Sequence, residues 1–202
     1  MEIIKEETLW YRFKNGDNDA LSLLYNQHIH QLFSYGMRIR GDDQLVKDCI
    51  QEVFVHLIDK KKKLTITEVT SAYLFKSLRN KLFEELRTKT LRSDNVKHIS
   101  TNEIVFDESM EQITIKSEEE ISRRRILEAA LGSLSNYQRE AIFLKYSQDF
   151  SYDKIAEILD IDVASARTLI YRSLKKVKEA ILPNIGKEIG AKSLLLYLSL
   201  LK

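Results

Sequence analysis

The sequence has 202 residues, and its 32 lysines and arginines nearly balance its 30 aspartates and glutamates. Its single cysteine excludes an internal disulfide and is typical of a reducing compartment, and no apolar run reaches the ~18–20 residues that span a bilayer. One proline, six glycines and few strand-like alternations favour an all-α protein, and residues 1–6 lack the layout of a signal peptide. We therefore expect a cytoplasmic helical protein.

Charge and hydrophobic patterns divide the chain into four parts. Basic residues slightly outnumber acidic ones in residues 1–95 and 121–182, whereas acidic residues predominate between them. This distribution predicts two small helical domains at 1–95 and 121–182, joined by an acidic linker at 96–120. An apolar tail, residues 183–202, follows. Two mildly basic modules on a tether suit a protein that meets nucleic acid at two places.

Two helices are predicted in the first 41 residues. Residues 6–14 form a short helix that ends at the turn Asn15-Gly16. The long helix expected over 18–41 has histidines at positions 28 and 30, which lie on different faces and therefore do not suit a metal pair. Its apolar residues recur at helical spacing: Leu21, Leu24, Tyr25, Leu32 and Ile39.

The helix predicted from Asp42 to about Lys60 has two distinct faces. One is a wide apolar stripe that has to face a core: Leu45, Val46, Cys49, Ile50, Val53, Phe54 and Leu57. Within it, Cys49 is expected to be a buried thiol rather than a reactive one. Opposite the stripe, residues spaced i, i+3, i+4 and i+7 form what we call the exposed strip: Asp48, Gln51, Glu52 and Val55. By pattern alone an ordinary solvated face is the default interpretation of the exposed strip, and a binding surface is the alternative.

A lysine run and a polar connector separate this helix from the next. Lys60–Lys63 end the helix, where the helix dipole favours cations, and Leu64–Thr70 is polar and β-branched. Thr70 or Ser71 caps the following helix, whose inward residues are Ala72, Phe75, Leu78, Leu82 and Leu86. Its outer side combines an aromatic ring with cations and an amide, as in surfaces that bind single-stranded nucleic acid: Tyr73, Lys76, Arg79, Asn80 and Arg87.

The sequence from Leu134 to Lys178 predicts three helices that contain a helix-turn-helix. Ser135 and Gln138 have the spacing of a capping box, and Ser151 is placed to cap the second helix. Asp160 is the residue expected at the tight turn between the second and third helices, and aspartate is one of the few non-glycine residues that tolerate a left-handed backbone. The expected inward positions of the three helices are Ala141, Ile142, Tyr146, Ile155, Ala156, Leu159, Ala166, Leu169, Ile170, Leu174 and Val177.

The outer face of the third helix is polar and basic, and we call it the recognition face: Ser165, Arg167, Thr168, Tyr171, Arg172, Lys175 and Lys176. Hydroxyl groups mixed with cations suit a helix that meets base edges and phosphates together. Two short helices around a tight turn, the second one basic, are typical of a DNA-binding helix-turn-helix. The alternative is a three-helix core piece with a solvated face, against which the small Ala156 at the helix crossing argues.

The C-terminal tail contains an apolar segment, residues 193–201, that is too short to span a membrane and too apolar to stay exposed. In a helix, Leu194, Tyr197, Leu198 and Leu201 would share one face. We therefore expect the tail to pack on one of the two domains, where it could cover a binding surface.

Three segments of the N-terminal half resemble the promoter-melting domain of bacterial sigma factors: 21–25, the D-x-x-Q-E-x-F stretch at 48–54, and 73–80 with 86–87. Joined to a separate helix-turn-helix, they make the chain similar to a sigma factor of the extracytoplasmic-function group. The resemblance covers residues 6–92 and 121–182, most of the chain.

The resemblance assigns a role to each surface. In that family the helix matching 42–60 docks on the clamp helices of the largest subunit of core RNA polymerase, so Asp48, Gln51, Glu52 and Val55 become candidate polymerase-binding residues. The connector 64–70, with Thr65 and Thr67, would capture a flipped-out base of the proximal promoter element. The outer side of the following helix would line the non-template strand, and the recognition face would read the distal element in the major groove.

The resemblance implies a dissociable initiation subunit that binds core RNA polymerase, promoter DNA and an anti-sigma factor, but no small-molecule substrate. The sequence contains no phosphate-cradling glycine loop, no metal-ligand spacing and no nucleophile–base pair, so we expect neither a cofactor nor a metal nor an enzyme. The alternative is a conventional helix-turn-helix regulator whose N-terminal domain senses a ligand or dimerises. An enzyme with an accessory DNA-binding domain is a more remote alternative.

Overall fold

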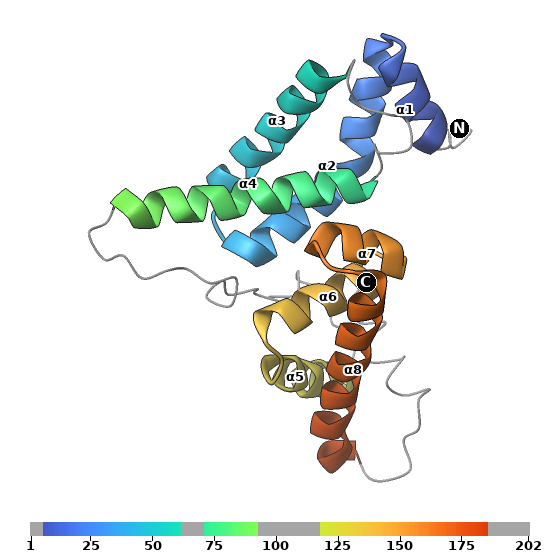
Figure 1. The fold of residues 1–202 in the computed structure, drawn as a ribbon. Coiled ribbons are helices and arrows are strands. Elements are labelled where there is room, and N and C mark those ends of the chain that lie inside the picture. The colour runs from blue at the N-terminus through green and yellow to red at the C-terminus, as the bar shows by residue number, and fades with distance from the viewer. Residues whose placement is uncertain (1–5, 62–70, 93–117, 186–202) are drawn as a thin grey trace. The chain divides into compact units, whose positions relative to one another are not determined.

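The computed structural model describes residues 6–61, 71–92 and 118–185, which form eight α-helices and contain no strand. The all-α fold class predicted from the sequence is therefore confirmed for this part of the chain. The chain divides into two compact units, Met1–His98 and Ile99–Lys202. Figure 1 shows the helices of each unit.

The first unit is organised around its second helix. Helix α2 contacts α1, α3 and α4, and α3 and α4 also contact each other (Figure 1). Helix α4 therefore packs on two neighbours at once. The bounds are α1 Glu6–Lys14, α2 Asn18–Arg40, α3 Asp43–Lys60 and α4 Ser71–Arg92.

Aspartates begin the second and third helices. The side chain of Asp17 accepts hydrogen bonds from the backbone N–H groups of Asp19 and Ala20, and that of Asp42 accepts from Leu45 N–H. Such caps satisfy N–H groups that have no partner inside the helix. These starts agree with the helices predicted from about 18 and 42.

The core of the first unit consists of the predicted apolar stripes and one close helix approach. The stripe of α3 is buried, apart from the half-buried Leu45, and Cys49 is among the buried residues. Gly36 of α2 is also buried, and a Cβ atom there would lie 2.6 Å from Val46 Cγ1 of α3. Only glycine therefore lets these two helices come this close.

A carboxylate joins the first helix to the start of the fourth. Glu6 Oε1 accepts hydrogen bonds from Trp10 Nε1 at 3.1 Å and from the backbone N–H of Ser71 at 2.9 Å. The same oxygen lies 3.5 Å from Nε2 of His28, which is buried in α2. His30 is exposed, so the two histidines do lie on different faces, as their spacing predicts.

The second unit is organised around its last helix. Helix α8 contacts α5, α6 and α7, and α6 and α7 contact each other (Figure 1). Helix α5 starts at Glu118, so the last acidic residues of the expected linker are helical, and α8 continues through Pro183. The bounds are α5 Glu118–Gly132, α6 Asn136–Tyr146, α7 Tyr152–Leu159 and α8 Val163–Ile185.

The predicted caps and turn of the helix-turn-helix are present. Ser135 and Gln138 form both bonds of the capping box, and the Ser151 side chain accepts from Lys154 N–H. Asp160 is left-handed, with φ 58° and ψ 49°. The hydroxyl group of Tyr137 donates to the carbonyl oxygen of Leu159 at 3.2 Å, which ties the first helix to this turn.

Several sequence predictions lie outside the described residues. They concern Thr65, Thr67 and the rest of the connector 64–70, most of the acidic linker, and the apolar tail. Within the helices that are described, none is long and apolar enough to cross a membrane.

Candidate nucleic-acid and protein interfaces

The exposed strip lies on the solvent side of α3. All four of its residues are exposed, and the apolar side chain of Val55 is 57% exposed. Ile58, which lies three residues further on, is 47% exposed and extends the strip. Exposed aliphatic side chains beside acidic and amide groups form a surface that can bury apolar area and accept hydrogen bonds.

Glu52 of the exposed strip is tied to α4 by an ion pair. Lys81 Nζ lies 2.8 Å from Glu52 Oε2, 3.4 Å from Glu85 Oε1 and 3.6 Å from Glu84 Oε2. The bond to Glu52 and the other nearby carboxylates raise the pKa of Lys81, although partial burial opposes this. Three carboxylates around one ammonium group leave the cluster acidic, which favours a basic partner.

The same carboxylates act on the buried thiol beneath them. Burial, and then the negative charges of Glu85 and Glu52, raise the pKa of Cys49 to about 11. The thiol therefore stays protonated at neutral pH and is a poor nucleophile, as expected from its place in the apolar stripe.

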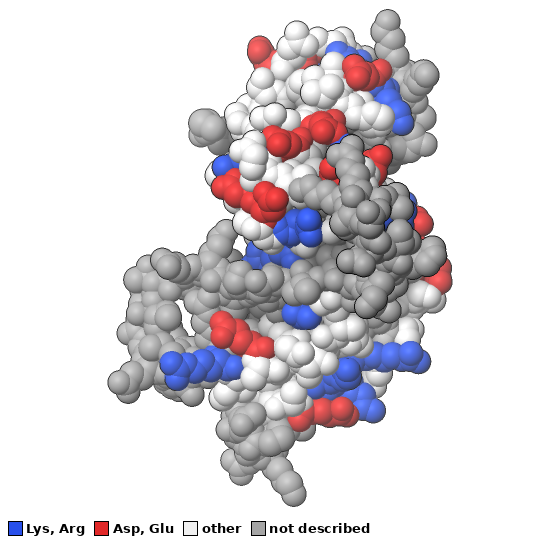
Figure 2. Space-filling model, turned by 90° about the vertical axis from the view of Figure 1, so that its left-hand side faces the viewer, with Lys and Arg blue, Asp and Glu red and all other residues white. Residues whose placement is uncertain are grey.

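A groove of about 570 Å³ runs between α3 and α4. Glu52 and Val55 of the exposed strip form part of its lining, and Tyr73 and Asn80 of the α4 outer side form another part. The two surfaces that the sequence assigns to different partners thus meet at one groove. On the visible face of the first unit, Figure 2 shows acidic side chains gathered with basic side chains beside them.

The predicted outer side of α4 is only partly correct. Asn80 and Arg87 are exposed, and Tyr73 and Lys76 are half-buried. Arg79, predicted to be available outside, is instead buried, with 7% of its surface exposed. Its guanidinium carbon lies 4.5 Å from the ring centroid of Phe83, so this cation stacks on an aromatic ring of its own helix.

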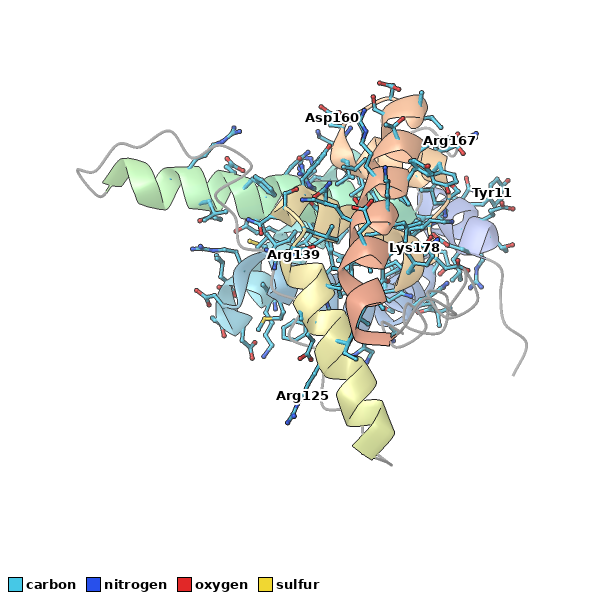
Figure 3. The ribbon with its side chains drawn as sticks, turned by 90° about the horizontal axis from the view of Figure 1, so that it is seen from below. Tyr11, Arg125, Arg139, Asp160, Arg167 and Lys178 are labelled. Atoms are coloured by element: carbon cyan, nitrogen blue, oxygen red, sulfur yellow. The ribbon has the colours of Figure 1, made fainter. Side chains whose placement is uncertain are left out.

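The recognition face of α8 is exposed throughout. Each of its seven residues is solvent-accessible, and the ring of Tyr171 is 70% exposed. Ala166, Ile170 and Val177 are buried on the opposite side, whereas Leu169 and Leu174 are half-buried. Figure 3 shows Arg167 near the start of α8 and Lys178 further along the helix.

Some groups of the recognition face already have partners within the second unit. Ser165 Oγ donates to Asp162 Oδ2 at 2.6 Å, and the backbone N–H of Ser165 donates to Oδ1 at 2.8 Å. With its proton committed, the Ser165 hydroxyl can only accept a further hydrogen bond. Lys176 Nζ donates to the carbonyl oxygen of Ser133 at 3.2 Å, which joins α8 to the end of α5.

Sequence reasoning missed two residues at these surfaces, Ile58 and Lys81. Ile58 follows Val55 by three positions, so the strip pattern could have included it. Asp162 is identifiable as a helix cap, and its bonds to Ser165 lower its pKa. Lys81 has no local signal, because its partner Glu52 lies on another helix.

Within the described residues, no group of histidine, cysteine, aspartate or glutamate side chains is arranged to hold a metal ion. The surfaces consist of exposed charges, hydroxyl groups and apolar side chains on rigid helices. Such arrangements bind macromolecules by shape and charge.

Comparison with known protein families matches both units. Residues 24–92 match the family model for sigma-70 region 2, and residues 124–177 match the model for sigma-70 region 4. The first range includes the exposed strip and the outer side of α4, and the second includes the recognition face.

Curated relatives agree with the family models over most of their length. The chain is 25% identical over 192 residues to the ECF RNA polymerase sigma-E factor of Escherichia coli strain K12, covering 92% of this chain and 99% of the relative. It is 18% identical over 161 residues to the ECF RNA polymerase sigma factor SigM of Bacillus subtilis strain 168, covering 77% of this chain and 91% of the relative.

Two solved structures share the fold. CnrH, in complex with the cytosolic domain of CnrY, is matched with a TM-score of 0.56 and 19% identity over 90% of this chain and 99% of CnrH. The sigma factor RpoE of Bartonella quintana, in complex with the anti-sigma factor NepR, is matched with a TM-score of 0.55 and 20% identity over 79% and 95% of the two chains.

Proposed function

The chain belongs to the sigma-70 family, as an RNA polymerase sigma factor of the extracytoplasmic-function group, and on this premise we propose which of its surfaces performs each step of initiation. It directs core polymerase to promoters, with the region-2 unit acting on the proximal element and the region-4 unit on the distal element. One observation carries this function: the two regions match two separate compact units, in this order along the chain. A conventional regulator would instead have a sensing domain where region 2 stands.

The exposed strip is the proposed polymerase-docking surface. Asp48, Gln51, Glu52 and Val55 are exposed on one side of α3, and the carboxylates around Lys81 make the adjoining groove acidic. A basic polymerase surface, such as the clamp helices of the largest subunit, would gain charge complementarity there. Val55 and Ile58 would add apolar contact area.

The outer side of α4 is the proposed surface for the melted strand. Tyr73 offers a ring for base stacking, Lys76 and Arg87 offer cations for phosphates, and Asn80 offers hydrogen bonds to base edges. Thr65 and Thr67, in the connector before α4, are proposed to contact an extruded base. Flipping a base costs a few kcal/mol, which stacking and pocket contacts offset. Arg79 is left out of this surface because it is buried.

The recognition face of α8 is proposed to read the distal element as duplex DNA. Arg167, Arg172, Lys175 and Lys176 supply cations, and Ser165, Thr168 and Tyr171 supply hydroxyl groups. Phosphate contacts would set the register of the helix, and base contacts would set the specificity. Because the Ser165 hydroxyl can only accept, it suits the amino group of adenine or cytosine rather than a guanine acceptor.

The remaining properties follow from the same proposal. Such a subunit acts in the cytoplasm and performs no bond chemistry of its own. An anti-sigma factor is a fitting inhibitory partner, since a structural relative is bound to one.

In vitro transcription tests the function. With purified core polymerase and randomised promoters, the chain is expected to select transcripts whose promoters share two spaced elements, while binding duplex DNA weakly alone. Tight operator binding by the chain alone, without any effect on core polymerase, would instead identify a conventional regulator.

Charge reversal tests the docking surface. Glu52→Lys is expected to weaken binding to core polymerase at least about tenfold, because like charges facing each other across an interface cost on the order of several kcal/mol. Glu7→Lys is the matched control, since Glu7 is an exposed carboxylate on α1 outside the strip. Glu52→Gln separates loss of the Lys81 ion pair from charge reversal. If Glu52→Lys and Glu7→Lys bind core polymerase equally well, the docking surface lies elsewhere.

A further inference from the structure

The ring of Tyr152 is approached by two cations from two different helices. Tyr152 is the first residue of α7; Lys145 Nζ in α6 lies 5.1 Å from its ring centroid, and Arg167 Cζ in α8 lies 5.3 Å from it. A cation within about 6 Å of a ring face is attracted by it.

These two cations have no acidic partner among the described residues. Lys145 Nζ donates a hydrogen bond to the carbonyl oxygen of Phe150 at 3.0 Å, and neither Lys145 nor Arg167 forms an ion pair there. Two positive charges held near one ring repel each other. A site that gathers cations without a carboxylate is complementary to an external anion.

The position of the site indicates which anion this is. Arg167 belongs to the recognition face and lies toward the N-terminal end of α8 (Figure 3). Tyr152 begins the helix that precedes the recognition helix, and in helix-turn-helix complexes that helix crosses the DNA backbone. The anions within reach of this part of the fold are therefore phosphates of the duplex.

We propose that Tyr152 is a positioning residue for the distal promoter element, whose ring holds Arg167 and Lys145 in place to bind backbone phosphates. This inference rests on the proposed role of the second unit and adds Lys145, outside the recognition helix, to its DNA contacts. An arginine side chain free in solvent loses rotamer freedom when it binds. An arginine already held against a ring loses less, so the ring raises the affinity without touching the DNA.

Fluorination of the ring tests the inference with almost no change of shape. Phenylalanine and trifluorophenylalanine are placed at position 152 of the full-length protein, which is assembled with core polymerase. Affinity for a promoter duplex is then measured between about 50 and 200 mM salt, because binding that depends on phosphate contacts weakens strongly over this range. Tyr152→Phe should bind like the wild type, because it keeps the ring. The fluorinated ring should bind about two- to fivefold more weakly, as loss of an exposed cation–π contact predicts.

A double-mutant cycle identifies the partner. Tyr152→Leu should weaken binding at least as much as fluorination, and the salt dependence should fall by up to about one ion, as for loss of one phosphate contact. In an Arg167→Ala background the same change should have a much smaller effect, because the held side chain is absent. Lys178→Met is the control for net charge, since it removes an exposed cation of α8 about three turns beyond Arg167 (Figure 3).

Two results would overturn the inference. One is a fluorinated ring that matches phenylalanine in affinity and in salt dependence. The other is a Tyr152→Leu loss that stays undiminished without Arg167 and also without Lys145, which would mean that the ring acts through neither cation. Failure of the proposed function is distinguishable, because the wild-type holoenzyme would then show no preference for any distal element.

Discussion

Helices α4 and α8 both have a row of predicted nucleic-acid contacts, but the two rows differ in how far their side chains are exposed to solvent. The recognition face of α8 is exposed at all seven positions, whereas the row on α4 includes two half-buried residues, Tyr73 and Lys76, and the buried Arg79. Helical spacing correctly predicted the inward residues of both helices, so an error in the assumed helical period does not explain why Arg79 is buried. The difference lies in how much of each helix is covered.

The width of the buried stripe on each helix explains the difference. Helix α4 packs on both α2 and α3, and its buried stripe is wide enough to include Leu74 beside the expected Phe75 and Leu78. Such a wide stripe leaves no exposed position for Arg79, which stacks on Phe83 instead. Helix α8 meets its three partners along a narrower stripe, which leaves its other side to solvent. A cation on a helix is thus a candidate DNA contact only once the width of the helix's buried stripe is known.

The largest expected effect comes from breaking the packing that supports α4. Gly36→Val should lower the free energy of unfolding by about 3 kcal/mol, the upper end for overpacking, because the new side chain would collide with Val46. Denaturant unfolding followed by fluorescence of Trp10, the only tryptophan and a buried residue of the same unit, measures this. Gly132→Ala, a second-unit variant followed by loss of helical circular dichroism, is the control, since a Cβ atom there meets nothing within 4 Å. An unchanged midpoint for Gly36→Val would contradict the close approach of α2 and α3.

A second prediction sharpens the comparison on the exposed helix. Arg172→Ala should weaken binding of the holoenzyme to the distal element by roughly 1–3 kcal/mol and relax its specificity if Arg172 meets a base. If Arg172 meets a phosphate, binding should fall evenly across sequences and the salt dependence should shrink by about one ion. Binding to a panel of distal elements at several salt concentrations separates the two cases. A variant indistinguishable from the wild type in both respects would show that this face does not meet DNA.

The parts of the fold that could be predicted correctly are those that depend only on residues close together in the sequence. The capping box of Ser135 and Gln138 and the left-handed Asp160 depend on a few successive residues, and both were predicted correctly. Gly36 could not be identified as a packing contact, because Val46 is opposite it only after α2 and α3 pair. The ion pair of Lys81 could not be predicted for the same reason, because its closest partner, Glu52, lies on another helix.

In the predicted sites, too, features set by nearby residues were predicted correctly and contacts with other parts of the chain were not. Exposure of the strip on α3 and of the recognition face follows from one helix period and one apolar stripe, and both surfaces are exposed as expected. What these side chains are already bonded to could not be predicted. The Ser165 proton is committed to Asp162, and Lys176 is bonded to the carbonyl oxygen of Ser133. Their assignment to particular partners remains a prediction.

The third prediction compares two arginines of α4. Arg79→Ala should lower the free energy of unfolding by about 1–2 kcal/mol, since it removes a buried side chain and its contact with Phe83. Arg87→Ala, which truncates an exposed arginine of the same helix, should change it by less than about 0.5 kcal/mol but should weaken binding to the melted strand. Unfolding and promoter opening are measured for both variants. Equal stability of the two would contradict the burial of Arg79.

The smallest expected effect concerns the aspartates that cap one helix in each unit. A hydrogen bond from Arg12 holds the pKa of Asp17 below its ordinary value, and bonds from Ser165 do the same for the pKa of Asp162. Each carboxylate therefore stabilises the fold above its unfolded-state pKa, about 3.9, and this contribution is lost as the pH falls through the lower folded-state pKa. Asp17→Asn and Asp162→Asn should each flatten the loss of stability below about pH 4.

Salt separates the two caps, because only one of them is an ion pair. Arg12 Nη2 lies 2.8 Å from Asp17 Oδ2, and 1 M salt, with a Debye length of about 3 Å, screens such an exposed pair. The bonds from Ser165 to Asp162 come from neutral donors and lose less. The effect of Asp17→Asn, followed by Trp10 fluorescence, should therefore shrink in 1 M salt, while that of Asp162→Asn, followed by loss of helical circular dichroism, should persist. If both shrink alike, the Asp162 cap depends on long-range charge rather than on its hydrogen bonds to Ser165.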